Sequence, residues 1–297
     1  MSLLEVVMRV LIIGGSGFIG RKMVIQAPSE IDITYSYYSK PIPDANVNSI
    51  KLNLMDNDLN WKDIIEGYDS IIICARPKGK NKSERDDVAI KTAKSFTAMI
   101  DAIQKSENNP FLLAIHGSLS YGDRNEDLVD TNSKISPIGF AQSYSIGEKP
   151  IRDYLKNSGN VAIIRAPWVL GNGSWYQSMY MASKKIPLLS KNPWMSIVYL
   201  DDLAQSAWEI LLKSKPGVYH SKLTYRCKQN EFAKIITSIT KKPYVKLGNI
   251  RLMFYEKQMR KSILSSIKLD DSRGSVSEED FARQALIEKI TKIHSDL

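Results

Sequence analysis

The sequence is poor in the residues that form disulfide frameworks and metal sites, with only two cysteines and three histidines in 297 residues. Cys74 and Cys227 lie far apart, and Cys74 falls in the apolar run SIIICA, which is typical of a buried strand. The histidines are widely separated, and the sequence has no HExxH motif and no paired Cys-x-x-Cys. We therefore expect neither a structural disulfide nor a metal, and a reducing compartment, the cytoplasm, fits best.

The sequence also lacks long hydrophobic runs. No apolar run approaches the roughly 20 residues that a membrane-spanning helix needs. The opening MSLLEVV lacks the basic start and the cleavage site of a secretory signal. We therefore expect no spanning segment and no membrane among the partners of this protein.

Positive charge is in excess, with 41 basic and 32 acidic residues and a net charge of +9. Such a balance favours anions, which include nucleotide phosphates, nucleic acid and acidic membranes. Residues 241–261 contribute seven basic residues and one acidic residue, a pattern most simply interpreted as a solvated surface. Because no recognised RNA-binding module is present, nucleic acid is the least favoured partner.

Apolar strand-like runs alternate with helical patterns along the first half of the chain. The runs are VLIIGG, DITYSY, SIKLNL, SIIICA, FLLAIHGS and VAIIRAPW. This alternation predicts an α/β protein with a doubly wound parallel (Rossmann) sheet covered by helices on both faces. It fades near residue 174, so we expect a dinucleotide-binding domain at residues 8–173. Residues 174–297 are expected to form mainly a smaller C-terminal substrate lobe, with segments that return to the first domain.

A glycine-rich turn, GGSGFIG, follows the first strand-like run and precedes a helical pattern. Glycines 15, 17 and 20 fit GxGxxG, while glycines 14, 17 and 20 fit GxxGxxG. Glycines permit a tight turn and let backbone N–H groups approach a pyrophosphate at a helix N-terminus. The alternative is a tight turn without a ligand. The predicted cofactor contacts in the turn are Gly14, Gly15, Ser16, Gly17, Phe18, Ile19 and Gly20.

The end of the second strand-like run bears on the choice of dinucleotide. An Asp or Glu there would bind the 2′-hydroxyl of NAD, whereas this sequence has YYSK. Ser39 and Lys40 could instead meet a 2′-phosphate, which favours NADP and leaves NAD open. The alternative for Lys40 is a solvated side chain in a loop.

Further segments occur in a characteristic order, namely LNLMD, CARP, GSLSYGD, IIRAPWVLGNGS and VYLDDLAQSAWEIL. Together with GGSGFIG they resemble the extended short-chain dehydrogenases/reductases, specifically the NAD(P)-dependent epimerase/dehydratase family. The resemblance implies a small-molecule substrate with a hydroxyl or carbonyl group, which could be nucleotide-linked. It also implies a homodimer, as in many relatives. It adds as cofactor contacts Asn53, Leu54, Ala75, Arg76 and Pro167.

The resemblance also implies a catalytic set of Ser or Thr, Tyr and Lys. In the family, the Tyr exchanges a proton with the substrate oxygen, and a Lys four residues later assists it. Tyr144 occupies the tyrosine position, but Glu148 stands four residues later. Lys149 cannot simply replace the lysine, because five residues along a helix is a rotation of about 140° from Tyr144. Ser118 is the candidate serine, although it matches the family spacing only with a one-residue shift.

These departures leave two hypotheses open. The protein is either an NAD(P)-dependent oxidoreductase or epimerase-like enzyme with Tyr144 as proton donor, or a non-catalytic NAD(P)-binding sensor or regulatory module. Another pair with Tyr-x-x-x-Lys spacing, Tyr180 and Lys184, lies in the expected substrate lobe and is interpreted as a chance match. Aromatic residues of that lobe could stack on a substrate ring or simply pack between lobes.

Overall fold

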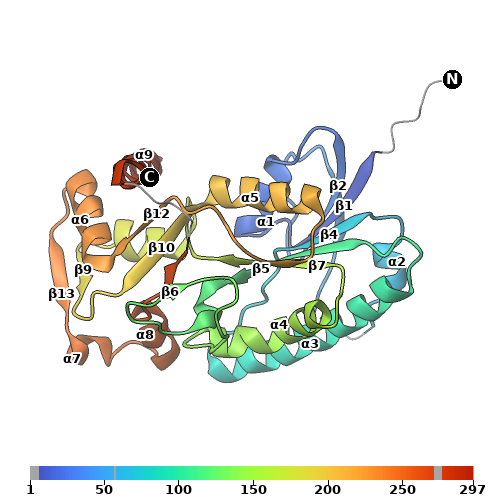
Figure 1. The fold of residues 1–297 in the computed structure, drawn as a ribbon, viewed down its shortest axis with the longest axis horizontal. Helices are drawn as coiled ribbons and strands as arrows, with labels where there is room; N and C mark the ends of the chain where they lie inside the picture. The colour runs from blue at the N-terminus through green and yellow to red at the C-terminus, as the bar shows by residue number, and fades with distance from the viewer. Residues whose placement is uncertain (1–6, 57, 271–275, 297) are drawn as a thin grey trace. The chain divides into compact units, whose positions relative to one another are not determined.

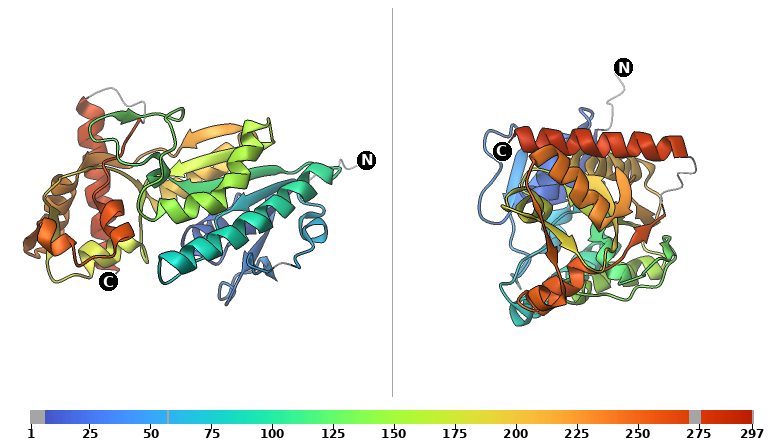
Figure 2. Two further views of the ribbon diagram at one scale, coloured as in Figure 1. Left: turned by 90° about the horizontal axis from the view of Figure 1, so that it is seen from below. Right: turned by 90° about the vertical axis from the view of Figure 1, so that its left-hand side faces the viewer.

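The computed structural model describes residues 7–56, 58–270 and 276–296, so the opening segment 1–6 lies outside the described residues. Packing divides the chain into two compact units, drawn in Figures 1 and 2. Unit 1 consists of Met1–His116, Ser143–Ile164 and Ala204–Tyr219, and unit 2 of Gly117–Gln142, Arg165–Leu203 and His220–Leu297. This division alternates along the chain. The sequence placed the main boundary after residue 173 and expected segments of residues 174–297 to return to the first domain. That residues 174–297 hold the substrate stays a prediction.

Unit 1 contains a seven-stranded sheet in the order β11-β7-β5-β4-β1-β2-β3. The pairs β1–β2, β2–β3, β1–β4 and β4–β5 are parallel. The strands are β1 (Met8–Ile13), β2 (Ile31–Tyr37), β3 (Asn48–Lys51), β4 (Ser70–Ile73), β5 (Phe111–Gly117), β7 (Val161–Ala166) and β11 (Gly217–His220). The predicted Rossmann-type α/β fold is confirmed.

Helices cover both faces of this sheet because its central strands are apolar on both sides. They are α1 (Phe18–Ile25), α2 (Trp61–Ile65), α3 (Lys82–Lys105), α4 (Ala141–Lys156) and α5 (Leu200–Lys213). Figure 1 shows α3 and α4 on one side of the sheet and α1 and α5 on the other. Phe96, Met99 and Ile103 of α3 pack with strand residues in one buried cluster. On the other face, the indole N–H of Trp208 donates to the carbonyl of Met23 at 3.1 Å.

Unit 2 contains three small sheets, with strand orders β12-β10-β8, β13-β9 and β14-β6. The strands are β6 (Leu128–Val129), β8 (Trp168–Leu170), β9 (Ile186–Leu189), β10 (Trp194–Tyr199), β12 (Tyr225–Lys228), β13 (Tyr244–Leu247) and β14 (Lys268–Leu269). The α-helices are α6 (Gln229–Thr240), α7 (Asn249–Leu252), α8 (Lys257–Ile263) and α9 (Val276–Ser295). A 3₁₀ turn, η1 (Ser118–Tyr121), and a π-helical segment, η2 (Gln177–Met181), complete the unit.

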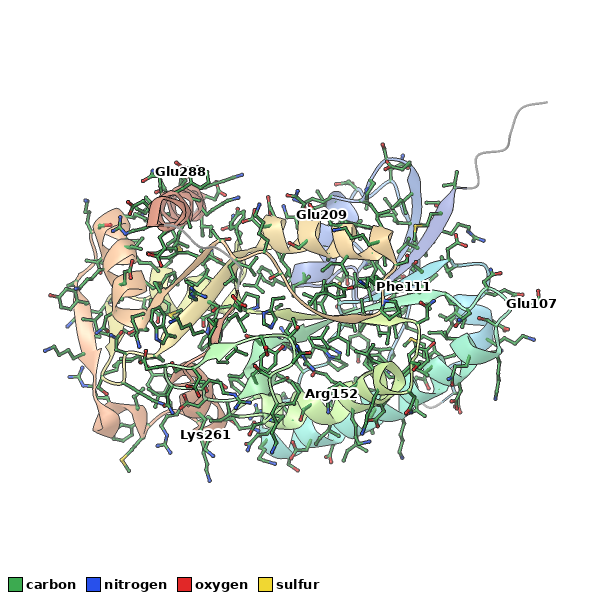
Figure 3. All side chains as sticks on the ribbon, in the orientation of Figure 1. Glu107, Phe111, Arg152, Glu209, Lys261 and Glu288 are labelled. Carbon is green, nitrogen blue, oxygen red and sulfur yellow. The ribbon has the colours of Figure 1, made fainter. Side chains whose placement is uncertain are left out.

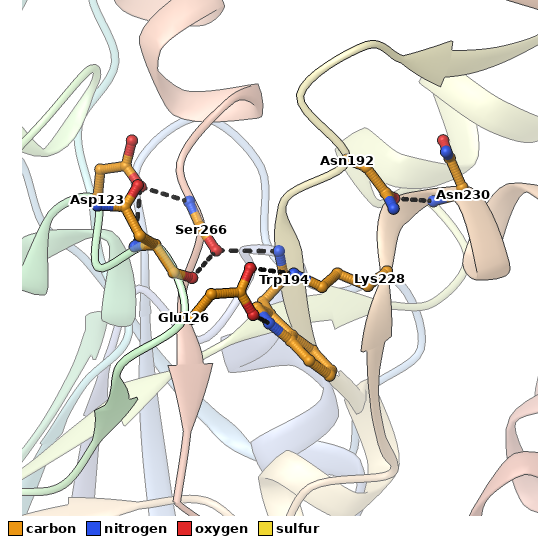
Figure 4. Close-up of polar contacts among 8 residues, drawn as sticks. Asp123, Glu126, Asn192, Trp194, Lys228, Asn230 and Ser266 are labelled. Atoms are coloured by element: carbon orange, nitrogen blue, oxygen red, sulfur yellow. Dashed lines mark hydrogen bonds and ion pairs between the residues drawn. The ribbon is translucent and has the colours of Figure 1, made fainter.

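A polar network fixes the loop that follows η1 (Figure 4). Asp123 accepts a hydrogen bond from the backbone N–H of Ser266 at 3.1 Å and forms an ion pair with Lys191. Glu126 accepts from the indole N–H of Trp194 at 2.6 Å and pairs with Lys228. Burial alone would raise the pKa of Asp123, but the hydrogen bonds from Lys191 and from backbone N–H groups outweigh it and lower the pKa.

The sequence predicted neither a membrane-spanning helix nor a metal site. No helix in the described part of the chain is both long enough and apolar enough to cross a membrane. No group of three or more metal-ligating side chains is present there either. Cys74 and Cys227 are unbonded thiols, and burial raises the pKa of Cys74 to about 12. Cys74 is therefore a weak nucleophile near neutral pH.

Candidate functional site

The glycine-rich turn is held between three strands of unit 1. Gly14 follows β1 with φ of 81°, a left-handed conformation that favours glycine. A Cβ atom on Gly14 would lie 2.7 Å from the Cα of Ala75, just beyond β4. The Gly14 N–H donates to the hydroxyl of Ser36 in β2 at 2.8 Å. The conformation of the turn is thus fixed by both neighbours of β1 in the sheet.

The other glycines of the turn allow close backbone approach. A Cβ atom on Gly20 would lie 2.1 Å from the carbonyl oxygen of Gly14, and one on Gly15 would lie 2.4 Å from the Cβ of Tyr35. Both distances are far shorter than normal contacts. The GxGxxG and GxxGxxG patterns are therefore both satisfied. The backbone geometry requires glycine at positions 14, 15 and 20 together.

The start of α1 leaves donors for an anion. Gly17 is the N-cap residue of α1 and, having no side chain, it does not cap the helix. The first intrahelical bond is donated by the Arg21 N–H to Gly17 at 2.8 Å. The N–H groups of Phe18, Ile19 and Gly20 consequently have no acceptor within the helix, and they lie at its positive end. This uncapped glycine turn fits the diphosphate of a dinucleotide.

The adenosine side of the predicted cofactor site lies along β2 and the segment after β3. Ser39 and Lys40 are exposed directly beyond β2, and neither is an acid. Leu54 is buried, while the side chain of Asn53 accepts a hydrogen bond from the N–H of Met55 at 3.2 Å. Ser36, the residue that anchors Gly14, is not among the residues predicted from the sequence. Its only signal was a hydroxyl at a buried position of a strand.

A small cavity of about 40 Å³ lies at the carboxyl ends of β4 and β5, where open α/β sheets bind ligands. Residues from β5, α3, α4 and the segment after β4 line it. Its volume is enough for a few water molecules. Its charged or titratable lining residues are Arg76, Arg85, His116, Tyr144 and Glu148.

The ring of Tyr144 contacts a cationic side chain at this cavity. That side chain is Arg76, which lies in the segment after β4 and not on α4. The guanidinium carbon of Arg76 lies 4.3 Å from the centroid of the Tyr144 ring. Arg76 is exposed and Tyr144 is half-buried. At an exposed site such a cation–π contact contributes roughly 0.5–1 kcal/mol. The sequence had assigned Arg76 to the cofactor, so its contact with Tyr144 was not foreseen.

Glu148 is directed into unit 1 and is only 8% exposed. One of its carboxylate oxygens lies 3.5 Å from Nδ1 of His116 in β5 and 3.5 Å from a guanidinium nitrogen of Arg152. Arg152, labelled on α4 in Figure 3, also donates to the carbonyl of Ser145 at 3.0 Å. Lys149 forms an ion pair with Asp153, and its side chain is 67% exposed. The surroundings of residue 148 therefore suit a carboxylate, and Lys149 points elsewhere.

The start of α3 is tied to the helix that carries Tyr144. Asn81 caps α3 by accepting a hydrogen bond from the Glu84 N–H at 3.0 Å. Asp86 bonds to Lys82 and to the hydroxyl of Ser143, the residue before Tyr144. These two hydrogen bonds, in that order, lower the pKa of Asp86. The position of Tyr144 thus depends on α3 as well as on α4, which continues through Pro150.

Two other predicted site residues belong to unit 2. Ser118 begins η1 and is buried, and Pro167 is buried between β7 and β8. Tyr180 is also buried, and its hydroxyl accepts a hydrogen bond from the amide of Gln229 at 2.8 Å. Burial raises its pKa, whereas Lys184 is exposed. Tyr180 is therefore a core residue.

Most of the aromatic residues noted in the second half of the sequence form one packed group. Tyr176 and Tyr180 stack with centroids 5.9 Å apart, and Trp168 meets Tyr176 edge to face at 4.7 Å. Tyr176 and Tyr180 belong to the buried core of unit 2. Both tyrosines thus pack within the core of unit 2, a use that differs from the stacking on a substrate ring and the packing between lobes considered from the sequence.

The sequence profile of the NAD dependent epimerase/dehydratase family matches residues 10–220. The chain belongs to this family. A search of curated protein sequences finds no significant match. Membership makes NAD(P) the cofactor type to be expected, and the glycine turn described above fits it.

Solved structures of the same fold are similar to this chain over nearly its whole length. The human epimerase family protein SDR39U1 (isoform 2) with NADPH has a TM-score of 0.74 at 18% identity, covering 98% of this chain and 100% of that one. The dTDP-glucose 4,6-dehydratase DesIV from Streptomyces venezuelae, with NAD and TYD bound, has a TM-score of 0.73 at 16% identity, covering 97% of each chain. A hypothetical dTDP-4-dehydrorhamnose reductase from Sulfolobus tokodaii has a TM-score of 0.70 at 19% identity, covering 93% of this chain and 94% of that one.

Proposed function

We propose that this protein is an NAD(P)-dependent oxidoreductase or epimerase that acts on a hydroxyl or carbonyl group of a small, nucleotide-linked substrate. The observation that carries this proposal is the position of Tyr144 at the carboxyl ends of β4 and β5, in the same unit as the uncapped glycine turn. Family membership supports the reaction type. The dTDP-linked names of two similar structures motivate the substrate class.

In the proposed mechanism, Gly14 to Gly20 hold the diphosphate through backbone N–H groups. The bound nicotinamide supplies or accepts a hydride. The hydroxyl of Tyr144 passes a proton to or from the substrate oxygen. Ser118 stays the predicted serine of the catalytic set.

The proposed motif differs from the family pattern, because Glu148 stands at the lysine position and is engaged by His116 and Arg152. In the proposal, Arg76 helps to hold the ring of Tyr144 in place, since its guanidinium lies over that ring. Arg76 would then act as a positioning residue for Tyr144, in addition to any contact with the cofactor.

Replacing Arg76 with glutamine is expected to lower kcat a few-fold and to leave KM within about two-fold, because a cation–π contact at an exposed site contributes roughly 0.5–1 kcal/mol to the position of the ring. Arg76→Lys should restore part of the lost rate. Lys78→Gln is the matched control, since it removes the same charge two residues away. The assignment is wrong if Arg76→Gln raises KM and leaves kcat unchanged.

We also propose NADP as the preferred cofactor, with Ser39 and Lys40 as the contacts of the 2′-phosphate. The Lys40→Glu replacement is expected to weaken NADPH binding about ten-fold or more and to leave NADH binding within a few-fold, because it places a carboxylate beside a phosphate. Calorimetry with both cofactors measures this difference. Lys91→Glu, an exposed residue of α3, is the control with the same change in net charge. Equal weakening of both cofactors would contradict the assignment.

A non-catalytic, NAD(P)-binding sensor is the second candidate, and the ion pairs of Glu148 favour it. One experiment distinguishes the two. The purified protein is titrated with all four pyridine dinucleotides and then assayed with dTDP- and UDP-linked keto and hydroxy sugars. Binding with turnover supports the enzyme, whereas binding without turnover supports the sensor. No binding of any of the four dinucleotides would reject both.

A further inference from the structure

The turn between α7 and α8 exposes two adjacent apolar side chains of unit 2. Met253 is 69% exposed and Phe254 is 87% exposed. Single exposed apolar residues are common, but two large neighbours at the tip of a turn are not explained by packing. The residues beneath them are well anchored, because Leu252 and Ile263 are buried in a cluster with Leu189 and Leu247. The pair therefore projects from a fixed base.

Three basic residues and one exposed acid, Glu256, lie near this pair along the chain. Arg251 precedes it, and Lys257 follows it at the start of α8; both are exposed. Lys261, labelled in Figure 3, lies one helical turn after Lys257 and therefore on the same side of α8. The neighbouring face of α8 carries buried Gln258 and Ser262. The face with exposed Lys257 and half-buried Lys261 is consequently cationic.

Strand β13, which contacts α7, exposes a further cation. Tyr244 and Lys246 are exposed, whereas Leu247 is buried, as expected of a strand with one solvent-facing side. Tyr244 is 55% exposed. Lys242 is excluded from this surface because its ammonium donates to the carbonyl of Met181.

This combination has the chemistry of a site for an anionic lipid surface. Apolar side chains such as Met and Phe enter the boundary between headgroups and acyl chains, while Lys and Arg bind the lipid phosphates. A single-stranded nucleic acid instead requires a groove with successive aromatic platforms, and Met253 offers no ring for stacking. We propose that Met253 and Phe254, with Lys246, Arg251, Lys257 and Lys261, dock this protein on an anionic membrane surface. The earlier expectation of no membrane partner rested on the lack of a spanning segment, which adsorption does not need.

The test is co-sedimentation of the full-length protein with vesicles of equal parts phosphatidylserine and phosphatidylcholine. We expect binding to these vesicles, weaker binding as salt is added, and little binding to pure phosphatidylcholine. The double variant Met253→Ser, Phe254→Ser is expected to lose about ten-fold or more of the vesicle affinity. Lys257→Gln combined with Lys261→Gln should weaken binding and flatten its salt dependence.

Phe281→Ser is the matched control, because Phe281 is 77% exposed on α9 of the same unit. It should leave vesicle binding unchanged, and all variants should keep the thermal unfolding midpoint of the wild type. Three results would overturn the proposal: equal binding to neutral vesicles, full binding by the Met253, Phe254 double variant, or self-association that this double variant abolishes when no vesicles are present. Salt-sensitive binding of poly-U RNA with no vesicle binding would also overturn it.

Discussion

Replacing Gly20 with alanine is expected to abolish dinucleotide binding and to lower the stability of unit 1. The new methyl carbon would lie 2.1 Å from the carbonyl oxygen of Gly14 and 2.7 Å from the Cα of Gly15. Both are backbone atoms, so no side-chain rotation relieves the clash, and the turn must move away from α1. Overpacking of this kind costs about 1–3 kcal/mol in folding free energy. Displaced N–H groups would no longer converge on a diphosphate.

Calorimetry with NADP and NAD and a thermal melt of the same preparation measure both effects. We expect affinity to fall at least about 100-fold and the unfolding midpoint to fall by several degrees, since each kcal/mol shifts it by roughly 2–4 °C in a domain of this size. Gly248→Ala is the control, because no described atom lies within 4 Å of the Cβ it would add. If the Gly20→Ala variant binds the dinucleotides with wild-type affinity, the glycine turn is not part of the cofactor site.

Replacing Tyr144 with phenylalanine is expected to reduce kcat/KM by about 100-fold or more and to leave dinucleotide affinity within a factor of about two. The replacement removes only the hydroxyl, and loss of a general acid or base has this magnitude. The ring remains in contact with Arg76, so the local packing is preserved. Steady-state kinetics on the best substrate of the nucleotide-sugar panel, together with calorimetry, measure the two quantities.

Tyr180→Phe provides the comparison, since Tyr180 is the tyrosine of the other Tyr-x-x-x-Lys pair. Its hydroxyl bonds to Gln229 in the core of unit 2, so the variant should lose some stability and keep its turnover. If Tyr144→Phe keeps full activity while Tyr180→Phe loses it, the catalytic assignment belongs to the second pair. If both variants remain fully active, neither tyrosine transfers the proton.

The parallel sheet and the glycine turn could be predicted because their signals are local. Apolar runs at βαβ spacing define the strands, and the GGSGFIG turn must follow β1 for its glycines to be useful. The anchor of that turn, Ser36, could not be predicted with the same ease. Its contact with Gly14 depends on the register of β1 and β2, which a single serine in a strand does not reveal.

The contacts around Tyr144 were also difficult to predict from the sequence, because they depend on how separate elements pack. Helical spacing correctly indicated that Lys149 points away from the position of Glu148. One partner of Glu148, Arg152, lies four residues along α4. The other partner of Glu148, His116, comes from β5, and Arg76 reaches Tyr144 from the segment after β4; only the fold brings these two to α4. Sequence spacing gives contacts along one helix, whereas contacts between elements depend on the packing of the sheet.

The ion pairs of Glu148 also constrain how this position can change over evolutionary time. A lysine at 148 would place a second cation against the guanidinium of Arg152 in a largely buried site, where an uncompensated charge is strongly unfavourable. A change of residue 148 to lysine is therefore expected to be strongly destabilising unless residue 152 changes with it. The dependence of residue 148 on residue 152 would favour keeping Glu148, whether or not its carboxylate benefits the reaction.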